Sequence, residues 1–323
     1  MPIDEADRLA TRRPALEARA RVLSAVRRWF EGEGFLEVDT PARVRAPGQE
    51  IHLDAIASED RWLVTSPEYA MKRLCGAGYQ RIVSIGKCWR AGERGPHHEP
   101  EFTMIEWYRA NEPLERIARD CEDLMRVAAD AVATSPGQRF AAPFRRTTVR
   151  ELLRAHAGVD LVGDESAPAL ATKARGAGIN PGRATAWDDI FFQMWLDRVE
   201  PRLAAAEPTF VFDWPAPLGA LARRREDDGR FVERFELYAA GLELANAFGE
   251  LTDPVEQRAR FEEETAARRG RGKVTYPIDE ALLAALARMP PTAGVALGFD
   301  RLLMLILGVP TIAEVMAFPE SEG

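Results

Sequence analysis

Two arginines stand where an anionic ligand would need them. Arg90 follows an apolar run and precedes the charged loop 91–100, and Arg301 lies at the expected start of a helix. A guanidinium binds phosphate or carboxylate through two parallel hydrogen bonds. The N-terminus of a helix disfavours a cation, so Arg301 at that place indicates a bound anion. The alternative for each arginine is a surface salt bridge, worth at most ~1 kcal/mol.

A second group of candidate residues is acidic. Glu236, Glu243 and Glu250 are spaced by seven residues each among apolar ones, and a turn near Gly241 separates the first from the second. Strand alternation places Glu236 and Tyr238 on one face. Carboxylates on one sheet face repel each other unless a cation neutralises them, and Mg²⁺ commonly binds one or two carboxylates plus substrate phosphates. The pattern favours a metal or a cationic ligand over exposed edge-strand acids.

Other polar positions carry weaker signals. His97 and His98 are adjacent, which is not a metal-binding spacing without further ligands. Phe102 could be a core residue or a stacking platform. The small residues of 294–298 would let a ligand approach the backbone closely. The segment 65–69 is also more polar than a strand needs.

Composition excludes several classes of protein. The chain has 323 residues and 46% hydrophobic residues, which is enough for a large core. Its net charge of −8 argues against a protein that mainly grips a nucleic-acid backbone. No apolar run reaches membrane-spanning length, and the charged N-terminus predicts no signal peptide. Cys75, Cys88 and Cys121 lack zinc or disulfide spacing, so we expect reduced thiols in a cytoplasmic protein.

Periodicity and turn signals predict an α+β fold. Residues 1–13 are expected to form an N-terminal arm, and a helix should begin at Pro14 and end near Gly32. The spacing of Thr148 and Glu151 predicts a capping box that opens another helix. Further expected elements are strands at 36–38, 61–65, 80–90, 101–110, 210–214, 234–244 and 294–298, helices at 114–132, 256–272 and from 300, and a peripheral insertion around 135–185 in a domain spanning 14–323. Because the strands come in antiparallel runs rather than in βαβ order, α+β is the better class.

In this order the segments resemble the class II aminoacyl-tRNA synthetases of the lysyl type. Segment 14–41 is similar to motif 1, with Pro41 as the interface proline. Segment 89–108 is similar to motif 2, and 294–301 with the following helix is similar to motif 3. The resemblance covers nearly the whole chain. It implies an antiparallel sheet flanked by helices, and a homodimer formed through motif 1.

The chain more closely resembles the elongation factor P–(R)-β-lysine ligases, a truncated branch of the lysyl type. An anticodon-binding domain needs on the order of 100 residues, and we expect none here because motif 1 starts near residue 14. Segments 65–74 and 106–109 look like the ligase versions. The resemblance implies that ATP activates (R)-β-lysine or lysine as an adenylate. The acyl group then passes to a lysine of elongation factor P, with Mg²⁺ as cofactor and with tRNA as an improbable partner.

The resemblance also implies roles for individual residues. Arg90 and Arg301 would be catalytic. The ATP site would comprise Arg90, Glu93, His98, Glu99, Phe102, Glu243, Leu244, Gly298 and Arg301. The amino-acid site would comprise Ser66, Pro67, Glu68, Glu106, Tyr108, Asn246, Glu250 and Ala296. Mg²⁺ would be held by Glu236 and Glu243.

Three positions depart from the ligase pattern. Glu99 stands in place of Asn, and Ala247 and Gly249 replace Gly and His on either side of Phe248. Three alternatives remain open: a stand-alone enzyme that charges tRNA with lysine, an asparagine-type ligase and a non-catalytic paralogue. An arginine-rich surface around Arg94, Arg109 and 223–225 is expected to guide the acceptor protein.

Overall fold

The structure is a computed structural model that describes residues 4–133, 140, 143–182, 184, 186–205 and 207–320. The chain divides into two compact units, one built from residues 1–142 and 252–323 and the other from 143–251. Each unit has a four-stranded, mainly antiparallel main sheet with helices packed on it, which confirms the α+β class. No helix among the described residues is both long and apolar enough to cross a membrane.

The first unit is organised around the hairpin expected at 80–110. Its four-stranded sheet has the order β1-β5-β6-β11, with β1 parallel to β5 and the other pairs antiparallel. The strands are β1 (Leu36–Glu37), β5 (Arg81–Trp89), β6 (Glu101–Ala110) and β11 (Thr292–Gly298). A small second sheet has the order β2 (Arg43–Val44), β4 (Arg61–Leu63), β3 (Ala57–Ser58).

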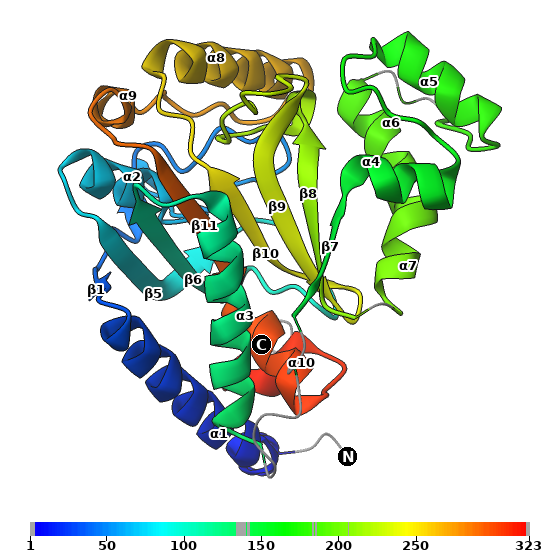
Figure 1. Cartoon of the computed structure of the whole chain (residues 1–323). Helices are drawn as coiled ribbons and strands as arrows, with labels where there is room; N and C mark the ends of the chain where they lie inside the picture. Colours follow the sequence, from blue (N-terminus) through cyan, green and yellow to red (C-terminus); the bar gives the residue numbers. More distant parts are fainter. Residues whose placement is uncertain are drawn as a thin grey trace. The chain divides into compact units, whose positions relative to one another are not determined.

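The helices of this unit flank the sheet (Figure 1). They are α1 (Glu5–Gly32), α2 (Glu68–Gly76), α3 (Leu114–Asp130), α8 (Pro254–Gly270), α9 (Glu280–Leu286) and α10 (Phe299–Leu307), with a 3₁₀ turn η4 (Ile312–Val315). Helix α3 packs along α1, α2 packs on α9, and α10 packs on β6. Successive residues of β6 face opposite sides, so Trp107 and Arg109 reach Asp120 of α3 while Glu106 and Tyr108 face away from it.

The N-terminal helix is longer than the sequence predicts. It begins at Glu5, so residues 5–13 are helical rather than an arm, and Pro14 lies inside the helix. Acidic residues in the first turn and strong helix formers before Pro14 account for the earlier start. The proline removes one backbone donor but does not end the helix.

The second unit has the strand order β10-β9-β8-β7. Its strands are β7 (Arg145–Thr148), β8 (Thr209–Pro215), β9 (Phe231–Ala239) and β10 (Leu242–Gly249). The expected turn near Gly241 is confirmed, because Ala240 and Gly241 both have positive φ and join two antiparallel strands. Its helical segments are α4 (Val149–Leu152), η1 (Leu153–Ala157), α5 (Ala167–Gly176), α6 (Trp187–Met194), η2 (Trp195–Val199), α7 (Glu200–Leu203) and η3 (Ala216–Leu218).

The capping box at Thr148 and Glu151 is confirmed, and the helical segment that it opens ends at Gly158. The region expected as a peripheral insertion differs from that prediction, because part of it is a helix packed into the core. It contains α5, whose Leu170 and Ala174 are buried in the same core as Trp195 and Trp214. The core of this unit is aromatic, with the rings of Trp195 and Trp214 5.1 Å apart. Residues 135–139, 141, 142, 183 and 185 of the expected insertion lie outside the described residues.

Candidate active site

Arg90 directly follows β5, at the end of the strand that leads into the motif 2 loop. Its guanidinium lies 5.1 Å from the centre of the Phe102 ring, on the neighbouring strand, and 3.6 Å from a Glu93 oxygen. Arg90 Nε also donates to the carbonyl of Thr65 at 3.4 Å. The guanidinium is thus fixed from three sides, and it is partly exposed.

Arg301 is positioned by a buried network at the start of α10. Asp300 accepts hydrogen bonds from Arg19 of α1 and from the backbone N–H of Thr103, each at 2.5 Å. This anchor holds the helix start against motif 2. Arg301 then donates to the carbonyl of His97 and lies 2.5 Å from His98 Nε2.

His98 is a neutral imidazole in this setting. Burial and then the charge of Arg301 lower the pKa of His98. Because an arginine can only donate, His98 Nε2 must accept and the ring proton sits on Nδ1. The Nδ1–H group of a neutral histidine can donate a hydrogen bond to an anion that binds beside the guanidinium.

Glu106 is the centre of a fixed hydrogen-bond network. Its Oε2 accepts from the Ser66 hydroxyl at 2.7 Å, and its Oε1 accepts from the Tyr108 hydroxyl at 2.6 Å. The side chain is almost fully buried. Burial and the neighbouring Glu68 raise the pKa of Glu106 to about 8.

Glu68 opens α2 and forms an ion pair of 2.6 Å with Lys72, one turn along the helix. Lys72 has a fully buried side chain. The backbone N–H of Glu68 donates to Ser66 Oγ, and Pro67 lies between them as the N-cap of the helix. The expected amino-acid residues of the first unit therefore come together at one place: Ser66, Pro67, Glu68, Glu106 and Tyr108.

The β11 strand lies beside this acidic group. Ala296 is the direct antiparallel partner of Glu106, and Gly294 is the partner of Tyr108. Cross-strand partners share a face, so the Ala296 methyl borders the Glu106 carboxylate. At Gly298 an added Cβ would meet only Arg301 carbons at 3.8 Å or more, so the backbone there is open to close approach.

In the second unit, Glu236 is already engaged by neighbours on β9. It accepts from Arg234 Nη2 and from the Tyr238 hydroxyl, each at 2.5 Å. Burial, followed by the charge of Glu243, raises the pKa of Glu236 to about 7. The two carboxylates are thus close enough to repel each other.

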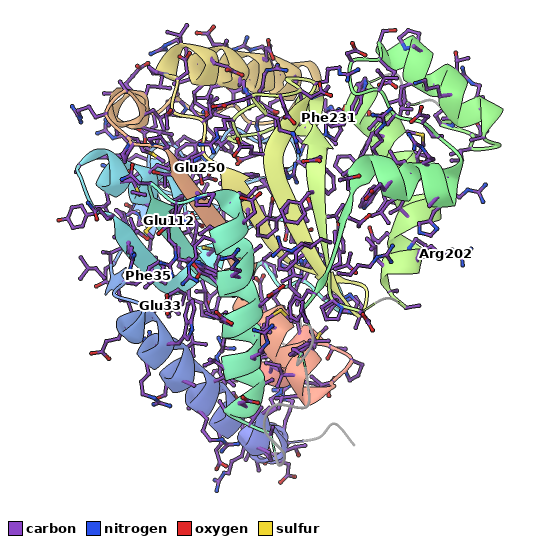
Figure 2. The ribbon with its side chains drawn as sticks, viewed as in Figure 1. Glu33, Phe35, Glu112, Arg202, Phe231 and Glu250 are labelled. Carbon is purple, nitrogen blue, oxygen red and sulfur yellow. The ribbon has the colours of Figure 1, made fainter. Side chains whose placement is uncertain are left out.

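Strand β10 presents the remaining candidates. Glu243 is the partner of Tyr238 and Asn246 is the partner of Glu236, so both share the face of Glu236. A bulge at Leu244 separates them and changes the alternation of β10. Glu250 follows β10 directly and is buried (Figure 2).

Comparison with known proteins agrees with this geometry. Residues 7–322 match the family described as tRNA synthetases class II (D, K and N). The chain belongs to this family. Within it, three similar proteins are named elongation factor P–(R)-β-lysine ligase, and the chain belongs to their family as well.

The relatives cover nearly the full length of the chain. The proteins from Erwinia tasmaniensis and Proteus mirabilis are each 38% identical over 312 residues, 93% of each chain. The protein from Salmonella gallinarum is 36% identical over 317 residues, 94% of each chain. The class II catalytic fold expected from the motifs is therefore confirmed.

Glu99 lies differently from the other expected ATP residues. It is 2% exposed, and its Oε2 accepts the backbone N–H of Glu320 at 3.0 Å. The carboxylate of Glu320 in turn accepts from Arg94 at 2.5 Å. The C-terminal segment thus holds the motif 2 loop at two points.

The expected arginine-rich surface is wrong in part. Arg109 is 1% exposed and forms buried ion pairs with Asp120 and Glu33, because strand alternation turns it towards α3. Glu33 and the Phe35 ring beneath Arg109 follow the end of α1 (Figure 2). In the second unit Arg223 pairs with Glu233, and Arg225 pairs with Asp213 and Asp227.

The two other departures from the ligase pattern have separate structural consequences. Ala247 is fully buried and lies on the opposite face of β10 from Asn246. Gly249 makes room for Glu233, because an added Cβ would lie 2.4 Å from Glu233 Oε2. By strand alternation Gly249 lies on the same face of β10 as Ala247.

Two residues outside the predicted amino-acid site, Glu50 and Tyr69, lie near the acidic group of the first unit. Burial and then Glu68 raise the pKa of Glu50 to about 7. Burial raises the pKa of Tyr69 well above its usual value, and the charges of Glu50 and Glu68 add to that shift. Glu50 lies in irregular backbone between β2 and β3, where no periodicity indicates which way a side chain points.

Few side chains in the described part of the chain are placed to bind a metal ion. No group of three or more His, Cys, Asp or Glu side chains in the described part of the chain is placed to hold an ion. Two repelling carboxylates, Glu236 and Glu243, still suit Mg²⁺ when substrate phosphates complete its shell. Cys75, Cys88 and Cys121 are buried free thiols, so the prediction of no disulfide framework is confirmed for them.

Proposed function

We propose that this protein uses ATP to activate (R)-β-lysine, or lysine, and transfers the aminoacyl group to a lysine ε-amine of elongation factor P. The near full-length similarity to proteins named for this activity carries the proposal. The acidic group around Glu106 supports it, because a substrate with two ammonium groups needs buried carboxylates.

In the first step, the substrate carboxylate attacks the α-phosphorus of ATP, and pyrophosphate leaves. This chemistry needs charge stabilisation rather than a nucleophilic side chain. Arg90 bridges the carboxylate and the α-phosphate, and Arg301 holds the γ-phosphate with neutral His98 beside it. The fixed positions of both guanidiniums support these roles.

We assign the remaining ATP contacts to the other residues of the expected ATP site. Phe102 stacks on adenine, Glu93 accepts from the adenine amino group, and the open backbone at Gly298 admits the nucleotide. Glu99 and Leu244 complete the proposed ATP site. Glu236 and Glu243 hold Mg²⁺, which neutralises phosphate charge when it is bound.

The amino acid is recognised by its two amines. Glu68 and Glu106 accept from one ammonium group, and Glu250 and Tyr108 accept from the other. Ser66, Pro67, Asn246 and Ala296 shape the rest of the site. In the second step, a neutral lysine ε-amine attacks the adenylate carbonyl, an amide forms, AMP leaves and the amine loses a proton.

The proposed assembly is a homodimer formed through 14–41. The proposal rests on the resemblance of this segment to motif 1, and Leu36 of the short strand β1 is 51% exposed within it. Sedimentation velocity of the full chain gives the oligomeric state. A monomer at micromolar concentration would contradict the dimer.

The decisive experiment has two readouts with purified protein. We expect ATP–pyrophosphate exchange with (R)-β-lysine or lysine in the absence of tRNA, and a mass increase of elongation factor P after incubation with ATP and the amino acid. Exchange that requires tRNA, with charged tRNA and an unmodified factor, would replace this function with the tRNA-charging alternative.

A further inference from the structure

Glu50 is held beside the expected amino-acid residues by an unusual piece of backbone. Gly48 has a φ of 140°, and an added Cβ there would lie 2.6 Å from Glu50 Oε2 and 3.4 Å from Thr65 Oγ1. This φ is one that L side chains rarely adopt, and an added Cβ would also displace the Glu50 carboxylate. Glu50 is therefore packed against the start of the loop that carries Ser66 and Glu68.

The backbone around Glu50 is fixed by helix α8. Arg268 is fully buried and donates to the carbonyl of Glu50 at 2.8 Å, and Glu264 accepts the backbone N–H of Ile51 at 2.9 Å. The side chain thus projects from a rigid segment. Rigid placement of a charged side chain is what recognition of a ligand requires.

Charges in this part of the first unit do not balance. Glu50, Glu68 and Glu106 are three carboxylates, and Lys72 is the buried ammonium that pairs with Glu68. Glu106 is fixed by two neutral hydroxyls. In the described part of the chain, no ion pair involves the carboxylate of Glu50. Glu50 and Glu106 therefore have no cationic ion-pair partner among the described residues, and a further cation beside them would favour their ionised forms.

Tyr69 supplies a second and independent observation. Its side chain is 8% exposed, and its hydroxyl makes no well-formed hydrogen bond among the described residues, with only the backbone of Gln49 near it. The charges of Glu50 and Glu68 both act on it. A buried hydroxyl without a partner costs free energy unless a ligand or a water satisfies it.

We propose that Glu50, together with the Tyr69 hydroxyl, receives an ammonium group of the substrate amino acid and so selects a diammonium substrate. This inference rests on the proposed activation of lysine or β-lysine and adds Glu50 to the residues that recognise it. The raised pKa of Glu50 agrees with a carboxylate that awaits a cation. The charged groups facing it are Glu68, Glu264 and Arg90.

The test is ATP–pyrophosphate exchange with the full chain and a Glu50→Gln variant, which keeps the shape and removes the charge. We expect KM for (R)-β-lysine to rise roughly 10- to 100-fold, the effect of losing a hydrogen bond to a charged group. KM for ATP should stay within about fivefold, a margin set by the ~1 kcal/mol ceiling for altered exposed charges. Glu59→Gln is the matched control, since Glu59 lies on the surface with its side chain 82% exposed.

Analogues separate recognition from a structural role. In inhibition of the exchange reaction, 3-aminohexanoic acid lacks the distal amine and 6-aminohexanoic acid lacks the proximal one. Glu50→Gln should weaken inhibition by the analogue that keeps the amine held by Glu50. It should leave inhibition by the analogue that lacks this amine unchanged. An equal penalty for both analogues, or none for (R)-β-lysine, overturns the proposal.

A second variant covers the case in which Glu50→Gln does not fold. Tyr69→Phe removes only the hydroxyl and keeps the ring packing against Phe261, 5.7 Å away. It should also raise KM for the amino acid and leave KM for ATP unchanged. If the wild-type protein shows no exchange with any of these amino acids, the proposed function itself fails, which is distinct from failure of the inference.

Discussion

Ala296 and Glu106 are direct partners across the antiparallel strands β11 and β6. The methyl of Ala296 therefore lies next to a carboxylate whose position is fixed by Ser66 and Tyr108. A methyl at this place limits how a substrate amine can approach Glu106. This position of the methyl gives a physical reason for the role in amino-acid binding that the family resemblance implies for Ala296.

Replacing Ala296 by glycine should shift the preference of the enzyme towards α-lysine. Removing one methyl from a packed site changes discrimination by ~1–3 kcal/mol. The measurement is the ratio of kcat/KM for lysine and (R)-β-lysine. Ala293→Gly is the control, because Ala293 lies on the same strand and pairs with Arg109 on the opposite face. An unchanged ratio would make Ala296 a packing residue only.

Arg90→Ala and Arg301→Ala should each abolish most adenylate formation while the fold persists. Loss of one preorganised charge at a reacting phosphate costs roughly 100- to 1,000-fold in kcat. Pyrophosphate exchange gives the rate, and circular dichroism checks the fold. Arg43→Ala, at an exposed ion pair with Glu59, serves as control. Near-normal exchange with either variant would refute the assigned role.

The motifs single out residues whose surroundings they do not predict. Arg90, Phe102, Glu106 and Arg301 stand out because their residue types combine with recognisable strand and helix signals. The sequence predicts an exposed Arg109, because arginine side chains are mostly exposed in folded proteins. Its burial depends on Asp120, which lies on a different element, and such a pairing is invisible before the fold is known.

Local patterns also failed where tertiary packing decides the outcome. Helix α5 has an alanine- and glycine-rich sequence, and it becomes recognisable only through the burial of Leu170 in an aromatic core. Glu50 lies in irregular backbone whose direction is set by Arg268 and by the space at Gly48. Neither the burial of Leu170 nor the orientation of Glu50 can be predicted from a short stretch of sequence.

The raised pKa of Glu106 predicts a pH-dependent stability difference. In the unfolded chain this carboxyl ionises near its ordinary pKa of 4.5, but in the fold it ionises near 8. Between these values the folded state binds more protons than the unfolded state, so the contribution of Glu106 to stability falls as pH rises. Glu106→Gln removes this effect.

We therefore expect Glu106→Gln to become more stable relative to wild type as pH rises from 5 to 8.5. Thermal unfolding without ligands, measured as the difference in Tm between the two proteins at each pH, tests the prediction. Glu59→Gln should give a constant difference. A Glu106→Gln difference that shrinks over this range would show that Glu106 is ionised in the free protein.

Asp120→Ala should strongly destabilise the first unit. Asp120 is fully buried and accepts from Arg109 Nε at 2.6 Å and from the indole N–H of Trp107 at 3.2 Å. Removing one partner of a buried ion pair costs ~3–5 kcal/mol. Urea unfolding measures the loss. Asp123→Ala on the same helix, where the side chain is 45% exposed, should cost less than ~1 kcal/mol.

Gly76→Ala should also destabilise the protein, through a backbone contact rather than a charge. Helix α2 ends at Gly76 against α9, and an added Cβ would lie 2.5 Å from the carbonyl oxygen of Ala285 and 3.0 Å from its Cβ. The two helices must separate to admit the methyl, and overpacking of this kind costs ~1–3 kcal/mol.

Gly32→Ala is the matched control, because Gly32 ends α1 and an added Cβ there meets nothing within 4 Å. The control should be neutral or stabilising by up to ~1 kcal/mol, since alanine favours a helix over glycine. Equal unfolding midpoints in urea for the two variants would show that α2 and α9 can move apart without cost. Because α2 carries Glu68 and Lys72, Gly76→Ala should also raise KM for the amino acid, and Gly32→Ala should leave it unchanged.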